Sequence, residues 1–222
     1  MEPEERIHEL MKGIVDLHLH AAPDYIPRKV TAYELALRAK KAGFKAIVIK
    51  SHHYPTVALA KALSEITGMQ VLGGIALNEP VGGFNVHAVE VAIKMGARIV
   101  WMPTIDAWNH RHFYKQGGGL TILTPRGELR DDVEVILGLI ADNNVALATG
   151  HLSPSEVEIL VREAFRVGVR KVLVNHPIWG PTLMTESQQQ RIANMGAYLE
   201  FTFYAMTPLG GSTPPSLSLI HI

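Results

Sequence analysis

Short apolar segments rich in β-branched residues alternate along the chain with longer segments of helical periodicity. Seven apolar segments can be distinguished: 14–19, 46–50, 71–77, 98–102, 145–149, 171–174 and 197–203. Most of them begin about 25 to 32 residues apart, with one longer interval after the fourth. This spacing is typical of strand–helix–strand units with parallel strands. Because parallel strands are buried on both faces, they read as nearly continuous hydrophobic runs.

The helical segments between these strands have recognisable starts and ends. Thr31 can cap a helix that Gly43 ends, and the sequence Ser153-Pro154 with Glu156 combines an N-cap, a proline in the first turn and a capping-box acid. Asp131 and its neighbour favour a further helix start through the helix dipole. Strands and helices therefore alternate along most of the chain.

This alternation predicts an α/β fold, a (β/α)8 TIM barrel truncated after about seven strands. A doubly wound open sheet is the competing architecture. The chain has no G-x-G-x-x-G and no G-x-x-x-x-G-K-[ST] motif, and the triple glycine 117–119 does not lie between a strand and a helix. The long connection 105–127 after the fourth strand is either a lid or an ordinary packed loop.

Composition narrows the class of protein. Of 222 residues, 47% are hydrophobic and 19% are charged, which is enough for a large core. Lys plus Arg and Asp plus Glu both number 21, so no charge excess points to nucleic acid or to a membrane surface. The absence of cysteine excludes disulfides, thiolate metal sites and a cysteine nucleophile. No apolar run approaches a signal or membrane segment. We expect a cytoplasmic protein with a small-molecule substrate, without nucleic-acid or membrane partners, and leave homo-oligomers open.

Histidines follow several of the predicted strands. His18 and His20 are two residues apart on the first strand, so they share a face, with Asp16 on the same face and Val15, Leu17 and Leu19 toward the helices. His151 follows the fifth strand and His176 the sixth. Active sites of barrels lie at the carboxyl ends of the strands. Each histidine alone could be a hydrogen-bonded core or loop residue, but together the four predict a divalent-metal site.

The segments VDLHLH, ATGHLS and VNHP resemble the amidohydrolase superfamily, and the resemblance spans essentially the whole chain. Members of that superfamily are metal-dependent hydrolases on a (β/α)8 barrel, and this sequence is similar to an uncharacterised branch. The resemblance implies that His18 and His20 bind the more buried metal. It implies that His151 and His176 bind a second one, or that one of them completes a mononuclear site while the other contacts substrate.

Two features of the superfamily lack a clear counterpart. Binuclear members often bridge the metals with a carboxylated lysine or a glutamate, commonly on strand four, which offers neither here. Lys50, at the end of the second strand, is the candidate bridging ligand, and the alternative is that it binds an anionic group of the substrate. The aspartate that the superfamily carries on strand eight has no matching strand, so the catalytic residue stays unassigned.

Further polar and aromatic residues follow the predicted strands and are candidate substrate contacts. They are His52, Asn78, Asp106, Asn175 and Trp179. The expected cofactor is one or two divalent ions, with zinc favoured and iron, manganese or cobalt also suited to imidazole ligands. The expected function is hydrolysis of an amide, ester, lactone or related bond by metal-activated water. The alternatives are a metal-dependent decarboxylase or other lyase of the same superfamily, and a non-catalytic ligand-binding barrel.

The last six residues, 217–222, read LSLIHI. This is the translation of CTGTCTCTTATACACATC, the end sequence of a common transposase-based sequencing adapter. We therefore expect a single incomplete barrel domain over residues 1–216, followed by adapter sequence from a metagenomic assembly. A barrel without its eighth strand would lack the acid of that strand, and we expect the chain as written to be nearly inactive.

Overall fold

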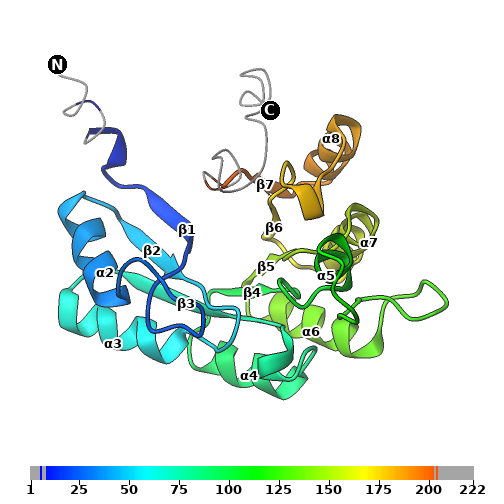
Figure 1. The fold of residues 1–222 in the computed structure, drawn as a ribbon, viewed down its shortest axis with the longest axis horizontal. Helices are drawn as coiled ribbons and strands as arrows, with labels where there is room; N and C mark the ends of the chain where they lie inside the picture. The colour runs from blue at the N-terminus through cyan, green and yellow to red at the C-terminus, as the bar shows by residue number, and fades with distance from the viewer. Residues whose placement is uncertain (1–5, 7–8, 203, 205–222) are drawn as a thin grey trace.

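The computed structural model describes residues 6, 9–202 and 204, and these residues form one curled sheet with helices around it (Figure 1). All strands are parallel, and each pairs with the next in chain order from β1 to β7. The strands are β1 (Val15–Leu19), β2 (Ala46–Ile49), β3 (Val71–Ala76), β4 (Ile99–Trp101), β5 (Ala146–Ala148), β6 (Val172–Asn175) and β7 (Tyr198–Glu200). This order is that of seven consecutive strands of a (β/α)8 barrel, so the predicted architecture is confirmed and the doubly wound sheet is excluded.

Most of the helices lie outside the curl, between consecutive strands (Figure 1). They are α2 (Ala32–Lys41), α3 (Val57–Thr67), α4 (Val86–Lys94), α5 (Trp108–Phe113), α6 (Asp131–Asp142), α7 (Pro154–Arg166) and α8 (Glu186–Asn194), with 3-10 turns η1 (Glu79–Val81) and η2 (Gly180–Thr182). The predicted N-cap Thr31 begins α2 and forms a capping box with Glu34, and the predicted capping box of Ser153 with Glu156 begins α7. Among the described residues, no helix combines the length and apolar character needed to cross a membrane.

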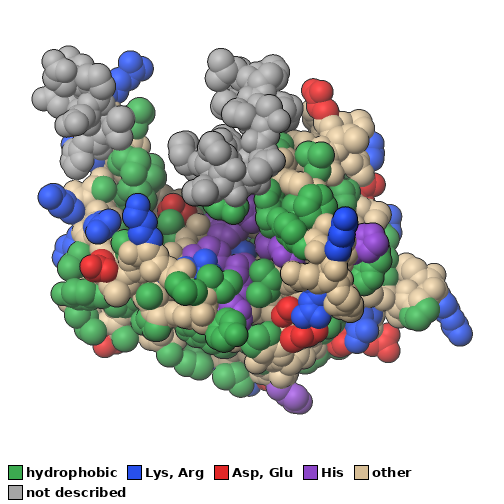
Figure 2. Space-filling view, viewed as in Figure 1, with side chains coloured by type: hydrophobic (Ala, Val, Ile, Leu, Met, Phe, Trp, Pro, Cys, Tyr) green, Lys and Arg blue, Asp and Glu red, His purple; other side chains and the backbone are tan. Residues whose placement is uncertain are grey.

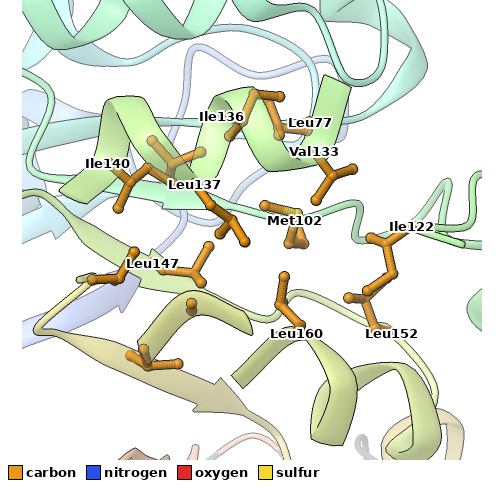
Figure 3. Close-up of a cluster of buried hydrophobic side chains, with 14 of the residues drawn as sticks. Leu77, Met102, Ile122, Val133, Ile136, Leu137, Ile140, Leu147, Leu152 and Leu160 are labelled. Carbon is orange, nitrogen blue, oxygen red and sulfur yellow. The ribbon is translucent and has the colours of Figure 1, made fainter. Parts of the chain in front are cut away.

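The main core fills the space between the sheet and the helices. Figure 3 shows Met102 and Leu147 from the sheet side packed among Ile136 and Leu137 of α6 and Leu160 of α7. A second set of buried residues faces the inside of the curl. It consists of Val48, Ala76, Ile99, Trp101, Ala148 and Leu173. These two layers fix the strands in position, so the residues at their carboxyl ends are held on a rigid frame.

The long connection after β4 is mostly packed rather than open. Ile122 within it is completely buried and belongs to the main core. The carboxylate of Glu156 accepts hydrogen bonds from Thr121 Oγ1 at 2.7 Å and from the Ile122 backbone at 3.3 Å, as well as from Ser153 Oγ at 2.7 Å. One buried acid thus caps α7 and anchors this connection to it.

Replacing Glu156 with alanine should lower the free energy of unfolding by roughly 3 kcal/mol, because it leaves several buried donors without an acceptor. The matched control is Glu158→Ala on the same helix, whose carboxylate forms an exposed ion pair with Arg191 at 2.7 Å and should cost well under about 1 kcal/mol. Urea unfolding followed by circular dichroism measures both. Equal losses in the two variants would contradict the anchoring role.

Strand β1 departs from the expected pattern. Leu19 packs on the core beside α2, but Val15 and Leu17 are 43% and 42% exposed, so the expectation that all three face helices is wrong for two of them. The reason is that α2 packs on β2 and α3 rather than over β1. The pairing of β1 with β2 also shifts register between Asp16 and Leu19, where the Asp16 carboxylate accepts the His18 backbone N–H at 3.0 Å. Such bulges often occur beside active sites.

The predicted adapter segment, 217–222, lies outside the residues that the structure describes.

Candidate active site

Five imidazole rings form a closed circle at the carboxyl ends of the strands. Successive ring centroids are 5.4 Å apart for His18 and His20, 4.7 Å for His20 and His52, and 6.1 Å for His52 and His151. The circle closes through His176, which lies 5.4 Å from His151 and 4.9 Å from His18. Figure 2 shows histidine side chains gathered in the central hollow of the molecule. The structure therefore brings the four predicted ligands together, and the candidate substrate contact His52 lies in the same circle.

The circle borders a cavity of about 890 Å³. Other side chains on its wall include His110 of α5, Trp179 after β6, Glu200 of β7 and Arg28 of the loop after β1. Trp179 is one of the predicted substrate contacts, whereas Glu200 and Arg28 are not among the residues that the sequence pattern indicated. The volume is in the range of small-molecule sites.

Burial keeps these imidazoles neutral. It lowers the pKa of His20 to about 2 and that of His176 to about 3, and it lowers the pKa values of His18, His52 and His151 well below the ordinary value. The positive charge of the nearby Lys50 lowers each of these pKa values further. Neutral imidazole is the form that binds metal ions.

Each histidine of the circle has its Nδ1 atom within hydrogen-bond distance of a neighbouring side chain. The partners are Glu200 Oε2 for His18 (2.9 Å), Arg28 Nη2 for His20 (3.3 Å), Thr104 Oγ1 for His52 (2.7 Å), His110 Nδ1 for His151 (3.0 Å) and Thr202 Oγ1 for His176 (3.0 Å). Within the described part of the chain, only His18 also has a partner at Nε2. Metal-binding histidines are typically oriented in this way, by a bond at the nitrogen that does not bind the metal.

Glu200 is the acid of the cavity wall that lies closest to the histidines, while Asp16 also lines the cavity. Ligand atoms of His18, His176 and Glu200 all lie within 4.8 Å of one another. Asn175 Nδ2 donates to Glu200 Oε2 at 2.6 Å, and Asn175 Oδ1 accepts the Gly150 backbone N–H at 2.8 Å. Asn175 therefore supports Glu200 without lining the cavity, and a direct contact of Asn175 with substrate stays a prediction. The sequence did contain a signal for Glu200, because it is the single acid in the seventh apolar segment.

Lys50 lies against His18, does not line the cavity, and has 1% of its surface exposed. Its Nζ atom is 3.0 Å from His18 Nε2 and 5.3 Å from the ring centroid of Trp101. Burial lowers the pKa of Lys50 to about 7, against the opposing effect of the Glu200 charge. The Lys50 amine thus contacts the nitrogen of His18 that would bind a metal, and a bridging role of Lys50 stays a prediction.

Asn78 and Asp106 lie beneath the rim and do not line the cavity. Asn78 is fully buried, donates to the His52 carbonyl at 2.9 Å and to Thr104 Oγ1 at 2.6 Å, and accepts from the Thr104 backbone at 2.8 Å. Asp106 accepts from Arg111 Nη2 at 2.6 Å. Both residues hold neighbouring loops together, and a contact of either with substrate stays a prediction.

An aromatic group from α5 and η2 covers one side of the cavity. His110 stacks on His151 with centroids 4.9 Å apart, and burial lowers its pKa to about 4. Trp179 presents an edge-on contact to His151 at 5.0 Å and to His176 at 5.4 Å. These contacts place the start of the long connection over the histidines, as a lid would lie, while residues around Ile122 pack into the core.

A protein-family model, described as "Family of unknown function (DUF6282)", matches residues 13–200. The chain belongs to the DUF6282 family. The matched range contains the five histidines, Lys50 and Glu200. No curated protein matches the chain.

Solved structures show what this DUF6282 member resembles in three dimensions. An amidohydrolase from Pseudomonas aeruginosa superposes with a TM-score of 0.57 at 13% identity, over 90% of this chain and 64% of that chain. A mutant of the organophosphorus hydrolase from Deinococcus radiodurans is similar at a TM-score of 0.49 and 13% identity, over 85% of this chain and 60% of that one. The chain thus spans less than two thirds of the length of these relatives. The predicted resemblance to amidohydrolases is confirmed at the level of the fold.

Proposed function

We propose that this DUF6282 member is a metal-dependent hydrolase that cleaves an amide, ester, lactone or related bond of a small molecule. The observation that carries the proposal is the circle of five neutral imidazoles, each held at Nδ1, with the Glu200 carboxylate beside it. Buried polar side chains normally form hydrogen bonds with one another or bind a ligand, so a circle of buried imidazoles supports the presence of a bound group.

The donor set fits a divalent ion. His18, His176 and Glu200 would hold it, since their ligand atoms already converge. By the resemblance to amidohydrolases, His20 and His151 would complete one or two sites, with Lys50 as the bridging ligand. Zinc suits such a mixture of imidazole and carboxylate best, and iron, manganese or cobalt can replace it. A divalent ion held by these residues would supply a water molecule whose pKa is strongly lowered and would polarise a carbonyl oxygen of the substrate.

The protein's own side chains prepare this chemistry. Glu200 Oε2 accepts a hydrogen bond from the Nδ1–H of His18, which fixes the tautomer of His18 and leaves the Nε2 lone pair for a ligand. Asn175 holds Glu200 in that position. His20 differs, because Arg28 donates to its Nδ1 and the neutral ring then carries its proton on Nε2. His20 therefore has to give up this bond before it can bind a metal through Nε2.

The experiment combines metal analysis with hydrolysis of a substrate panel. The chain is purified, its metal content is measured by mass spectrometry, and aryl esters, N-acyl amino acids and lactones are tested before and after treatment with dipicolinate. We expect nearly one zinc or more per chain, and slow hydrolysis that the chelator removes and added zinc restores. Absence of metal would favour a ligand-binding barrel. Bound metal with release of carbon dioxide from carboxylic acids, and no hydrolysis, would favour a lyase.

A further inference from the structure

Arg28 brings a permanent positive charge to the wall of the cavity. Among the described residues that line the cavity, it is the single lysine or arginine, and the histidines beside it are neutral. It lies in the loop between β1 and α2, and 17% of its side chain is exposed. None of the roles proposed above for the metal site requires an arginine here.

A buried carboxylate fixes the position of this arginine. Arg28 donates from Nε to Asp24 Oδ2 at 2.8 Å, and its Nη2 lies 2.7 Å from the same oxygen. The side chain of Asp24 is only 1% exposed, so it cannot itself reach a ligand in the cavity. Its other oxygen is 3.2 Å from Ser51 Oγ and 3.1 Å from His53 Nδ1, both in the loop after β2. Arg28 is therefore oriented before any ligand arrives.

Part of the guanidinium is not committed to Asp24. Nη2 also approaches His20 Nδ1 at 3.3 Å, a long hydrogen bond. Nη1 forms no hydrogen bond in the described part of the chain. A guanidinium has five N–H groups in a planar fork that matches the oxygens of carboxylate and phosphate groups. The exposed donors thus present the geometry that recognises a compact anion.

We propose that Arg28 binds an anionic group of the substrate, a carboxylate or a phosphate-like group. This inference rests on the proposed function, because it takes the cavity as the reaction chamber. The guanidinium touches His20, which is a member of the imidazole circle, so the anionic group binds directly beside the circle. The substrate class is therefore a small acid whose charged group is only a few bonds from the bond that is cleaved.

The test observes Arg28 directly in protein freed of metal, so that no ion can bind the probes. The protein is labelled with ¹⁵N-arginine, and the Nε–Hε resonance of Arg28 is assigned by its loss in Arg28→Lys. Benzoate, phenylphosphonate and the neutral isostere benzamide are titrated separately. We expect one or both anions to shift this resonance with a dissociation constant near the millimolar range, and benzamide to bind at least tenfold more weakly. The dissociation constants of benzoate and phenylphosphonate, compared with each other, show whether the site prefers a carboxylate or a phosphonate.

Two further variants complete the test. Arg130→Lys alters a surface arginine that pairs with Asp132 at 2.8 Å and should bind benzoate normally. The double variant Asp24→Asn with Arg28→Gln removes both charges of the buried pair, so no unpaired carboxylate remains to prevent folding. It should bind benzoate at least tenfold more weakly than the parent protein. Equal binding of benzamide and both anions, or an unshifted Arg28 resonance, overturns the inference. Metal content and hydrolysis are measured separately, so a protein without metal that still binds benzoate through Arg28 would contradict the proposed function and retain the anion site.

Discussion

Replacing His18 with alanine should reduce the metal content of the purified protein from nearly stoichiometric to less than about a tenth of an ion per chain, and abolish hydrolysis. His18 has side-chain partners at both nitrogens of its ring. Its Nδ1 atom bonds Glu200, its Nε2 atom is 3.0 Å from Lys50, and its ring adjoins both His20 and His176. Its removal therefore takes away one ligand and the partner that orients another. Mass spectrometry of metal content is the direct measurement.

The matched control is His87→Ala, because the side chain of His87 is 94% exposed on α4. This variant should keep the metal content and the thermal midpoint of the parent. Circular dichroism of His18→Ala checks that the fold persists, since β1 retains its backbone pairing with β2. A folded His18→Ala protein with unchanged metal content would remove His18 from the site.

Replacing Glu200 with glutamine should weaken metal binding by about 10- to 100-fold, the usual effect of losing a carboxylate that binds or orients at a metal site. Glutamine has nearly the same shape, so Asn175 and His18 keep a hydrogen-bond partner while the negative charge disappears. The Glu200 charge also raises the pKa of Lys50 against burial. Without it the pKa of Lys50 should fall below its present value near 7. Competition with a fluorescent zinc chelator measures the affinity.

Glu158→Gln is the control for this experiment, since Glu158 forms only an exposed ion pair with Arg191. It should leave zinc affinity unchanged within about twofold, as expected for a surface charge. Unchanged affinity in Glu200→Gln as well would show that Glu200 neither binds the metal nor orients a ligand, and the proposed centre would then rest on histidines alone.

The sequence was sufficient for the strand order and for the histidines. Strands that are buried on both faces appear in the sequence as continuous apolar runs. His18 and His20 lie on the same side of β1, as their two-residue spacing predicts, despite the bulge in this strand. The exposed Val15 and Leu17 could not be anticipated, because alternation tells which residues share a face and not whether a helix covers that face.

The rest of the site depends on contacts between segments far apart in the chain. Glu200 and His18 are separated by 182 positions, and only the closing of the sheet brings them within 2.9 Å. Arg28 and Asp24 lie in an irregular loop, where no periodicity indicates which side chain faces a cavity. Asn78 follows its strand in a position typical of a substrate contact, and in the structure its amide bonds the backbone of neighbouring loops. Its complete burial could not be anticipated, because burial of loop residues is not encoded in a local pattern.

The hydrogen bonds of the Asn78 amide limit how the loops after β2 and β4 can diverge in evolution. It joins the loop after β2, through the His52 carbonyl, to the loop after β4, through Thr104 and the Asp106 backbone. An insertion in either loop would leave polar groups of the other unpaired in the interior, where each costs about 1–3 kcal/mol. Divergence of substrate preference among relatives should therefore proceed by exchange of side chains at constant loop length on this side of the barrel, with length variation confined to segments that Asn78 does not join.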